Sequence, residues 1–241
     1  IVKEVLIRFV HVHAFCFFLH LLAHFILTGH CAFSVYFIKE LLVHFSRLHA
    51  GNALKLDIAN KFEISLIGGD LTNGPLNLNA IVYGTPYSEK ILMRDSAQVG
   101  DLICISSPTG RAKKGLVDWN NMESNSKYIQ DYLRPLPKIE LGKKIVNFAS
   151  ACIDTSDGLL ADLKKLLKAS KQGAVINLDD IPITIDINDI NAGDDYDLCF
   201  TVPKSKFDKT FYKIGEVTEG LEIKLTSNKG YDIDINGYEH F

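Results

Sequence analysis

Three short turns rich in carboxylates carry the residue types and spacings that best support chemistry in this sequence. They are Gly-Gly-Asp at residues 68–70, Asp-Thr-Ser-Asp-Gly at 154–158 and Gly-Asp-Asp-Tyr-Asp at 193–197. Each borders an apolar segment, so its carboxylates are expected to be exposed while a regular element holds their backbone. Magnesium prefers oxygen ligands and is usually held by a few carboxylates together with substrate phosphates. The three turns together therefore predict a site for magnesium and a polyphosphate.

The turn at 154–158 begins a helix. Asp154 and Asp157 flank Ser156 just before a segment with an apolar helical stripe, so both carboxylates can face one pocket. A helix N-terminus also offers unpaired N–H groups and the positive end of its dipole to an anion. Two simpler interpretations stay open: Ser156 or Asp157 only caps the helix, and residues 68–70 form only a tight turn. The GxxxxGK[ST] sequence of P-loop enzymes does not occur.

The elements that position these turns indicate an α/β (α+β) fold. Residues 62–67 are expected to form a short buried strand ending at two glycines, which puts Asp70 just past the carboxyl end of a strand. Open α/β sheets bind their ligands at that edge. Further strands are expected at 76–82, 102–106, 174–178 and 198–202, and helices at 139–151 and from 159 to a stop at Gly173.

A proline-containing stretch divides the chain. Residues 134–137 are Arg-Pro-Leu-Pro, the clearest linker in the sequence, and a domain boundary is expected there. The expected organisation is an atypical segment at 1–50, the remainder of an amino-terminal domain at 51–137, and an α/β domain at 138–241.

The first 50 residues differ in composition from the rest. They contain seven of the eight histidines and eight of the fourteen phenylalanines, and residues 9–38 carry no Asp, Glu, Lys or Arg. A bilayer needs about 20 apolar residues, but the histidines are costly in hydrocarbon, so no membrane partner is expected. Three interpretations stay open: a start that is degenerate or displaced in frame, a buried helical segment, and a membrane span. No carboxylate or Cys stands at ligand spacing from these histidines, so they predict no metal site.

Charge and cysteine content argue against several protein classes. The formal net charge is -3 and the basic residues are not clustered, so no nucleic-acid partner is expected. The five cysteines are scattered and form no CxxC pair. That pattern argues against a disulfide framework or a zinc site and indicates the thiols of a cytoplasmic protein.

Taken in order, the three turns and their flanks resemble thiamine-monophosphate kinase. The matching runs are Leu-Ile-Gly-Gly-Asp-Leu-Thr-Asn-Gly-Pro-Leu at 66–76, Ile-Asp-Thr-Ser-Asp-Gly-Leu at 153–159, and Gly-Asp-Asp-Tyr-Asp-Leu-Cys-Phe-Thr-Val-Pro at 193–203. Gly-Asp at 100–101, Arg-Pro at 134–135 and the closing Gly-Tyr-Glu-His-Phe at 237–241 also resemble that family. The resemblance runs from about residue 54 to residue 241 and keeps the family's motif order.

The resemblance implies a two-domain fold shared with aminoimidazole ribonucleotide synthetase, with residues 51–137 belonging to the ATP-binding domain. It implies a homodimer that pairs through the amino-terminal domains, with ATP bound near that interface. The implied reaction is the ATP- and Mg²⁺-dependent phosphorylation of thiamine monophosphate to thiamine diphosphate. Such a reaction rests on positioning and charge neutralisation, so no covalent or acid-base catalytic residue is expected.

The resemblance also assigns roles by position. The implied magnesium ligands are Asp70, Asp154 and Asp157. The implied ATP contacts are Gly69, Asp70, Arg94 and Ser156, and the implied substrate contacts are Asp194 and Tyr238.

The region before residue 68 departs from the family pattern. Family members carry Asp-Asp-Ala-Ala-like, Asp-Thr-Leu-Val-like and Ser-Asp-Ile-Ala-Ala-Met-like motifs there, whereas the first aspartate of this chain is Asp57. A truncated amino-terminal domain is therefore expected. Two alternatives to an active kinase stay open. One is a catalytically impaired remnant that still folds or binds nucleotide. The other is a different superfamily member, such as selenophosphate synthetase or the hydrogenase-maturation dehydratase.

Overall fold

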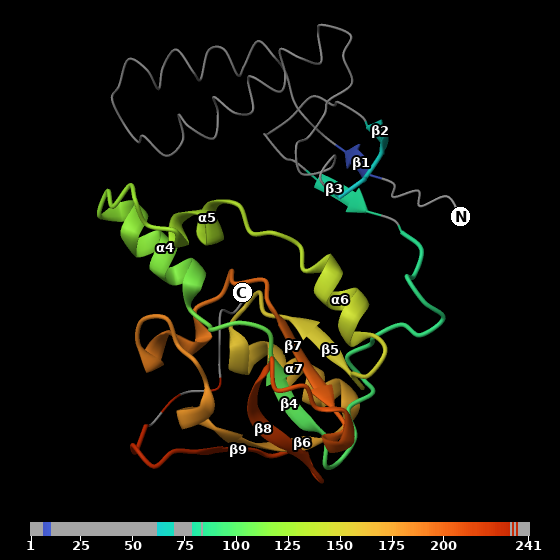
Figure 1. Ribbon diagram of the computed structural model, residues 1–241, viewed down its shortest axis with the longest axis vertical. Helices are drawn as coiled ribbons and strands as arrows, with labels where there is room; N and C mark the ends of the chain where they lie inside the picture. Colours follow the sequence, from blue (N-terminus) through green and yellow to red (C-terminus); the bar gives the residue numbers. More distant parts are fainter. Residues whose placement is uncertain are drawn as a thin grey trace, which may run out of the picture. The chain divides into compact units, whose positions relative to one another are not determined.

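The computed structural model describes residues 7–10, 62–69, 79–82, 84–231, 233 and 235 (Figure 1). The chain divides into two compact units, Ile1–Pro86 and Tyr87–Phe241. The boundary expected at residue 137 falls inside the second unit. The reason is that β4 (Leu102–Ile105) pairs with strands from the carboxyl-terminal part of the chain.

The described part of the first unit is a three-stranded sheet in the order β2-β1-β3. Its strands are β1 (Ile7–Val10), β2 (Leu66–Gly69) and β3 (Asn79–Val82), with β1 parallel to β2 and antiparallel to β3. β2 begins later than the strand expected at 62–67 and includes both glycines, which pair with β1. The sequence did not indicate β1, and residues 11–50 lie outside the described residues.

The second unit is built on a six-stranded sheet in the order β5-β7-β4-β8-β6-β9. Neighbouring strands are antiparallel except β6 and β9, which are parallel. The remaining bounds are β5 (Cys152–Asp154), β6 (Gly173–Asn177), β7 (Leu198–Val202), β8 (Tyr212–Thr218) and β9 (Ile223–Thr226). The strands expected at 102–106, 174–178 and 198–202 are confirmed as β4, β6 and β7, whereas the sequence did not indicate β8 and β9.

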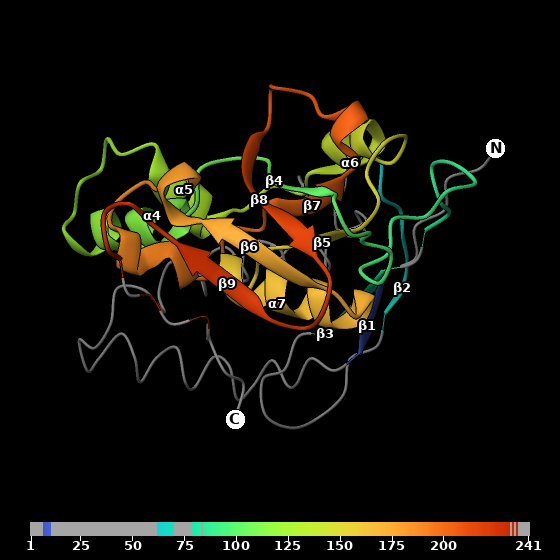
Figure 2. The same cartoon turned by 90° about the horizontal axis from the view of Figure 1, so that it is seen from below.

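Helices cover both faces of this sheet (Figures 1 and 2). α7 (Leu159–Ser170) buries its leucine stripe in one core, which includes Ile103 of β4. α6 (Ile139–Ile145) packs into a second core, which includes Cys104. Successive residues of a strand point to opposite faces, so neighbouring residues of β4 serve different cores. Each buried leucine of α7 contributes about 2 kcal/mol.

Both of these helices end differently from the expectation. α6 stops at Ile145 instead of continuing to 151, because the chain has already joined the sheet at Ser150, whose N–H bonds to β7 at 2.8 Å. α7 is followed by Lys171 in the left-handed region, with φ of 56°. Gly173, the expected stop, is instead the first residue of β6.

Two further helices, α4 (Arg111–Asn120) and α5 (Tyr128–Leu133), pack against each other. Across the described residues, none of the helices combines the length and apolar character that crossing a bilayer requires. The uncharged stretch at 9–38 lies outside the described residues beyond Val10.

Candidate active site

The turn that follows β5 and the turn that precedes β7 are joined along their backbones. β5 and β7 are antiparallel neighbours, so the end of one strand lies beside the start of the other. Three hydrogen bonds continue this pairing: Thr155 N to Asp197 O at 2.8 Å, Tyr196 N to Thr155 O at 2.9 Å, and Asp194 N to Ser156 O at 2.9 Å. Two of the three carboxylate turns expected from the sequence therefore lie together.

Gly193 allows this close approach. A Cβ atom added there would lie 2.3 Å from the Ser156 carbonyl oxygen and 3.4 Å from the Asp157 Cα. Distances under 3 Å to backbone atoms cannot be relieved by a side-chain rotation. A residue without a side chain is therefore required where the two turns meet.

Gly193→Ala is expected to lower the free energy of unfolding by about 2 kcal/mol, because the added methyl forces the two turns apart. The measurement is urea unfolding followed by circular dichroism. Gly142→Ala is the matched control, since a Cβ at this α6 position meets nothing within 4 Å. That change should stabilise by up to about 1 kcal/mol. Equal effects of the two substitutions would contradict the steric account.

The carboxylates of Asp154, Asp157 and Asp194 all act electrostatically on Tyr196. Asp154 and Asp194 are exposed and Asp157 is partly buried. The Tyr196 hydroxyl donates to Asp194 Oδ1 at 3.4 Å. The pKa of Tyr196 is raised, first by burial and then by the negative charge of Asp194, with smaller effects from Asp154 and Asp157. All three thus place negative charge near Tyr196, and carboxylate oxygens are the donors that a divalent cation prefers.

A carboxylate inside α7 fixes the backbone of the first turn. Asp162 is almost fully buried, and its Oδ2 accepts hydrogen bonds from Ser156 N and Asp157 N, both at 2.8 Å. Its other oxygen, Oδ1, pairs with the Lys165 ammonium at 2.7 Å. Lys165 also forms an ion pair with Asp157. These contacts hold Ser156 and Asp157 at the start of α7 without using their side chains as caps.

The expectation that Ser156 or Asp157 caps α7 is therefore wrong. The N-cap is Gly158, which has φ of 120° and forms no side-chain cap bond. A side chain at the end of the short 3-10 helix Ile187–Asn191 takes the capping role: Asn191 Oδ1 accepts the first-turn N–H of Leu160 at 3.0 Å. The serine hydroxyl and the aspartate carboxylate at the turn are consequently not used to cap the helix.

Asp195 is a structural carboxylate. It is buried, and it accepts hydrogen bonds from Gly110 N at 2.6 Å, Ala112 N at 2.9 Å and Thr109 Oγ1 at 3.1 Å. Burial raises its pKa, while these donors act in the opposite direction. Asp195 therefore ties the start of α4 to the turn at 193–197 and is not available for a ligand.

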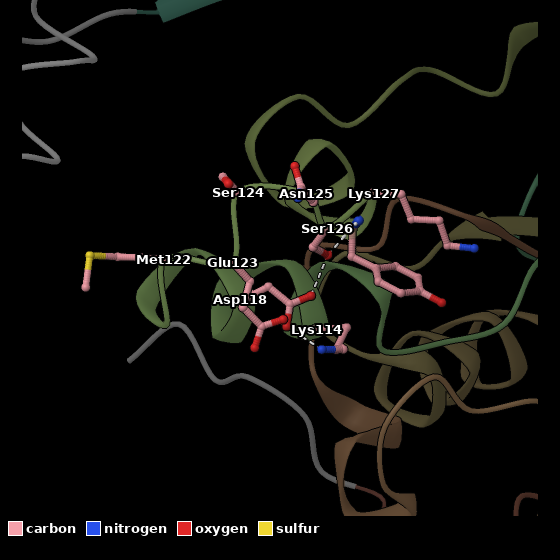
Figure 3. Close-up of a pocket in the computed structure, with 9 residues that line it drawn as sticks. Lys114, Asp118, Met122, Glu123, Ser124, Asn125, Ser126 and Lys127 are labelled. Atoms are coloured by element: carbon pink, nitrogen blue, oxygen red, sulfur yellow. Dashed lines mark hydrogen bonds and ion pairs between the residues drawn. The ribbon is translucent and has the colours of Figure 1, made fainter.

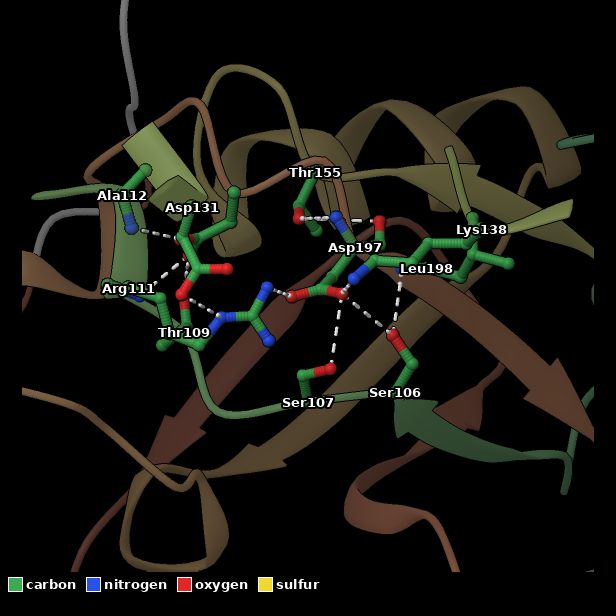
Figure 4. Close-up of polar contacts among 12 residues, drawn as sticks. Ser106, Ser107, Thr109, Arg111, Ala112, Asp131, Lys138, Thr155, Asp197 and Leu198 are labelled. Atoms are coloured by element: carbon green, nitrogen blue, oxygen red, sulfur yellow. Dashed lines mark hydrogen bonds and ion pairs between the residues drawn. The ribbon is translucent and has the colours of Figure 1, made fainter. Parts of the chain in front are cut away.

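Asp197 is the centre of a buried ionic network (Figure 4). Its carboxylate pairs with Arg111 Nη2 at 2.8 Å and with Lys138 Nζ at 3.0 Å, and it accepts a hydrogen bond from Ser107 Oγ at 3.1 Å. The aspartate is 4% exposed. Of the three aspartates in the turn at 193–197, only Asp194 is exposed. Asp194 is therefore the candidate ligand contact of this turn, and Asp195 and Asp197 are structural residues.

The remaining candidate residues belong to other elements or lie outside the described residues. Arg94 is exposed and its carbonyl accepts from Ser170 Oγ at 2.9 Å, at the far end of α7, roughly 16 Å along the helix from the site turn. Gly69 ends β2 in the first unit. Asp70 and Tyr238 lie outside the described residues.

The described part of the site fits magnesium in its donor type. All its candidate ligand atoms are carboxylate oxygens, which is the chemistry that Mg²⁺ takes. Within the described residues, however, no group of three His, Cys, Asp or Glu side chains is arranged to hold a metal ion. In that part of the chain, Asp154 and Asp157 therefore do not by themselves complete a metal site.

A hollow of about 540 Å³ lies apart from the two turns, around the end of α4 and the start of α5 (Figure 3). Its buried carboxylate, Asp118, is paired with Lys114 and accepts from the Ser126 hydroxyl. These three polar groups satisfy one another, and we assign the hollow no role in the chemistry.

Three residues that shape the site were missed by the sequence reasoning. Asp162 carries a detectable signal, since an acidic residue in the first turn of a helix interacts with its N–H groups. Lys165 follows it at a spacing of three, which is that of a helical ion pair. Asn191 has no such signal, because it reaches α7 from a distant part of the chain.

Comparisons with known proteins agree with the family resemblance of the sequence. No protein-family model matches the chain. It is 38% identical over 214 aligned positions to the thiamine-monophosphate kinase of Buchnera aphidicola subsp. Schizaphis graminum, covering 76% of this chain and 66% of that protein. It is 32% identical to the enzyme of the same name from Salmonella typhimurium, with the same coverage. The chain thus spans 66% of the length of these curated relatives.

Solved structures show the same fold. The thiamine-monophosphate kinase of Stenotrophomonas maltophilia matches with a TM-score of 0.67 and 25% identity, over 92% of this chain and 71% of that one. AaThiL complexed with AMPPCP and TMP matches with a TM-score of 0.71 and 22% identity, over 100% and 74%. The hydrogenase maturation protein HypE matches at 13% identity with a TM-score of 0.66, over 99% and 77%, a likeness of fold alone.

Proposed function

The chain belongs to the thiamine-monophosphate kinase family, and from that premise we propose that it phosphorylates thiamine monophosphate to thiamine diphosphate, using ATP and Mg²⁺. The observation that carries the proposal is the junction of the turns at 154–158 and 193–197. It brings together the two turns that carry Asp154, Asp157 and Asp194, at the start of α7. The fold is the two-domain α/β fold of aminoimidazole ribonucleotide synthetase.

Each residue of the site has a proposed role. Asp154 and Asp157, with Asp70, hold Mg²⁺, and bound Mg²⁺ neutralises charge on the transferred phosphoryl group. Gly69, Asp70, Arg94 and Ser156 contact ATP. The Asp194 carboxylate and the Tyr238 ring contact thiamine monophosphate.

The protein contributes orientation more than covalent chemistry. Ser156 and Asp157 have their backbone N–H groups fixed by Asp162, so this part of the site is preorganised before a ligand arrives. Asp194 is held against Ser156 by a 2.9 Å backbone hydrogen bond. Substrate and nucleotide contacts are thereby kept at a fixed spacing, which in-line phosphoryl transfer requires.

Assembly and location follow the same premise. We propose a homodimer with ATP near the interface, a cytoplasmic location and no nucleic-acid partner. The net charge of -3 without a basic cluster supports the last of these.

The test is conversion of thiamine monophosphate to thiamine diphosphate by the purified full chain, with saturating ATP and Mg²⁺. Turnover that requires both is the expected result. Nucleotide binding without turnover would favour the alternative of a catalytically impaired remnant. Turnover of a different phosphate acceptor, with none of thiamine monophosphate, would favour another member of the superfamily.

A further inference from the structure

The Lys165 ammonium forms an ion pair with a carboxylate that the proposed function assigns to magnesium. The Lys165 ammonium bridges Asp157 and Asp162, which are both close to the start of α7. It lies in the second turn of the helix, and long helical side chains point back toward the N-terminus, which explains its reach. A positive charge thus lies beside Asp157 Oδ2.

The two carboxylates differ in how firmly they are held. The Asp162 side chain is 2% exposed, and its Oδ2 is committed to the two N–H groups of the turn. The Asp157 side chain is 17% exposed and the Lys165 side chain is 43% exposed. Of the two ion pairs, the one with Asp157 is therefore closer to solvent and easier to exchange, while Asp162 stays in place as an anchor.

We propose that Lys165 is a tethered cation that neutralises Asp157 in the metal-free protein. To bind at Asp157, Mg²⁺ must displace the Lys165 ammonium. Asp162 is the anchor that keeps the ammonium beside the site during the exchange. The inference rests on the proposed function only in taking Asp157 as a magnesium ligand. Lys165 acts through Asp157, so it is a positioning residue and not a catalytic one.

Two effects follow from this arrangement. In the metal-free protein the ammonium reduces the repulsion among the carboxylates around Tyr196, so the turn keeps its geometry before the ligand binds. It also weakens Mg²⁺ binding, because the metal competes with an intramolecular cation at high effective concentration. Removing the ammonium should therefore strengthen metal binding.

The test measures Mg²⁺ binding to the full chain by titration calorimetry with MgCl₂ alone, in the absence of nucleotide and substrate. Lys165→Met is expected to bind Mg²⁺ roughly fivefold more tightly than the unmodified protein, as for loss of a partly exposed ion pair. Lys165→Arg keeps the positive charge and should bind Mg²⁺ as the unmodified protein does. Lys168→Met, an exposed lysine of the same helix, is the matched control and should also leave the affinity unchanged.

The double variant Asp157→Asn with Lys165→Met decides which carboxylate is involved. It should lose the whole gain in affinity, because the ligand that Lys165 protects is gone. Equal Mg²⁺ affinities of the unmodified protein and Lys165→Met, including no binding by either, would overturn the inference. A gain that persists without Asp157 would overturn it as well. The proposed function fails separately, by absence of turnover in a protein whose Lys165→Met variant does bind Mg²⁺ more tightly.

Discussion

Replacing Asp154 by asparagine is expected to lower the turnover of thiamine monophosphate by about 100-fold or more while leaving the fold unchanged. Substitutions of residues that merely support metal ligands already cost 10- to 100-fold, and a ligand itself should cost at least as much. A factor of 100 corresponds to about 2.7 kcal/mol of transition-state stabilisation. Asp154 ends β5 and is exposed, so no packing or buried partner is lost. Turnover is measured by steady-state kinetics at several Mg²⁺ concentrations.

The control for this change is Asp180→Asn. Asp180 is an exposed aspartate of the same unit, at the end of the short helix Leu178–Asp180, and belongs to neither site turn. It should leave turnover and the Mg²⁺ requirement unchanged, and both variants should unfold within about 0.5 kcal/mol of the unmodified protein. Unchanged turnover in Asp154→Asn would remove that carboxylate from the magnesium site. A large loss of stability instead would assign it a structural role.

The strands and helices that carry the site could be predicted from short-range patterns. The alternation and length of apolar runs identified β4, β6, β7 and α7. β8 and β9 were not identified, because buried and exposed residues do not alternate regularly along β8 and no residue of β9 is fully buried. The expected domain boundary also failed to match the division of the chain. A Pro-rich stretch at 134–137 marks a turn, but only strand pairing decides which sheet β4 joins.

The residue types of the site could be predicted from the sequence. Which of its aspartates are exposed candidate ligand contacts and which are structural could not. Glycine and aspartate spacing located both turns. Nothing in that spacing distinguishes Asp194, which is exposed, from Asp195 and Asp197, which are buried. The difference comes from distant partners: Gly110 and Ala112 at the start of α4 bind Asp195. Such contacts join residues more than 80 positions apart and leave no local pattern.

Asp197→Asn is expected to lower the free energy of unfolding by about 3 kcal/mol. Removing one partner of a buried ionic network leaves the other charges uncompensated, which typically costs 3–5 kcal/mol. The lower end applies, because Lys138 is 28% exposed and Arg111 keeps Asp131 at 3.7 Å. For a unit of this size, the loss corresponds to a fall in melting temperature of roughly 6–12 °C. Calorimetric and urea unfolding at neutral pH would measure it.

Asp194→Asn is the matched control, since it makes the same chemical change three residues earlier in the same turn. Asn tolerates the left-handed backbone that Asp194 adopts, with φ of 68°, and the side chain is exposed, so stability should change by less than about 0.5 kcal/mol. The KM for thiamine monophosphate should rise instead, because the proposed substrate contact loses its charge. If both variants lost stability equally, the distinction between a structural Asp197 and a ligand-binding Asp194 would be wrong. If neither changed stability, the network around Asp197 would not stabilise the fold.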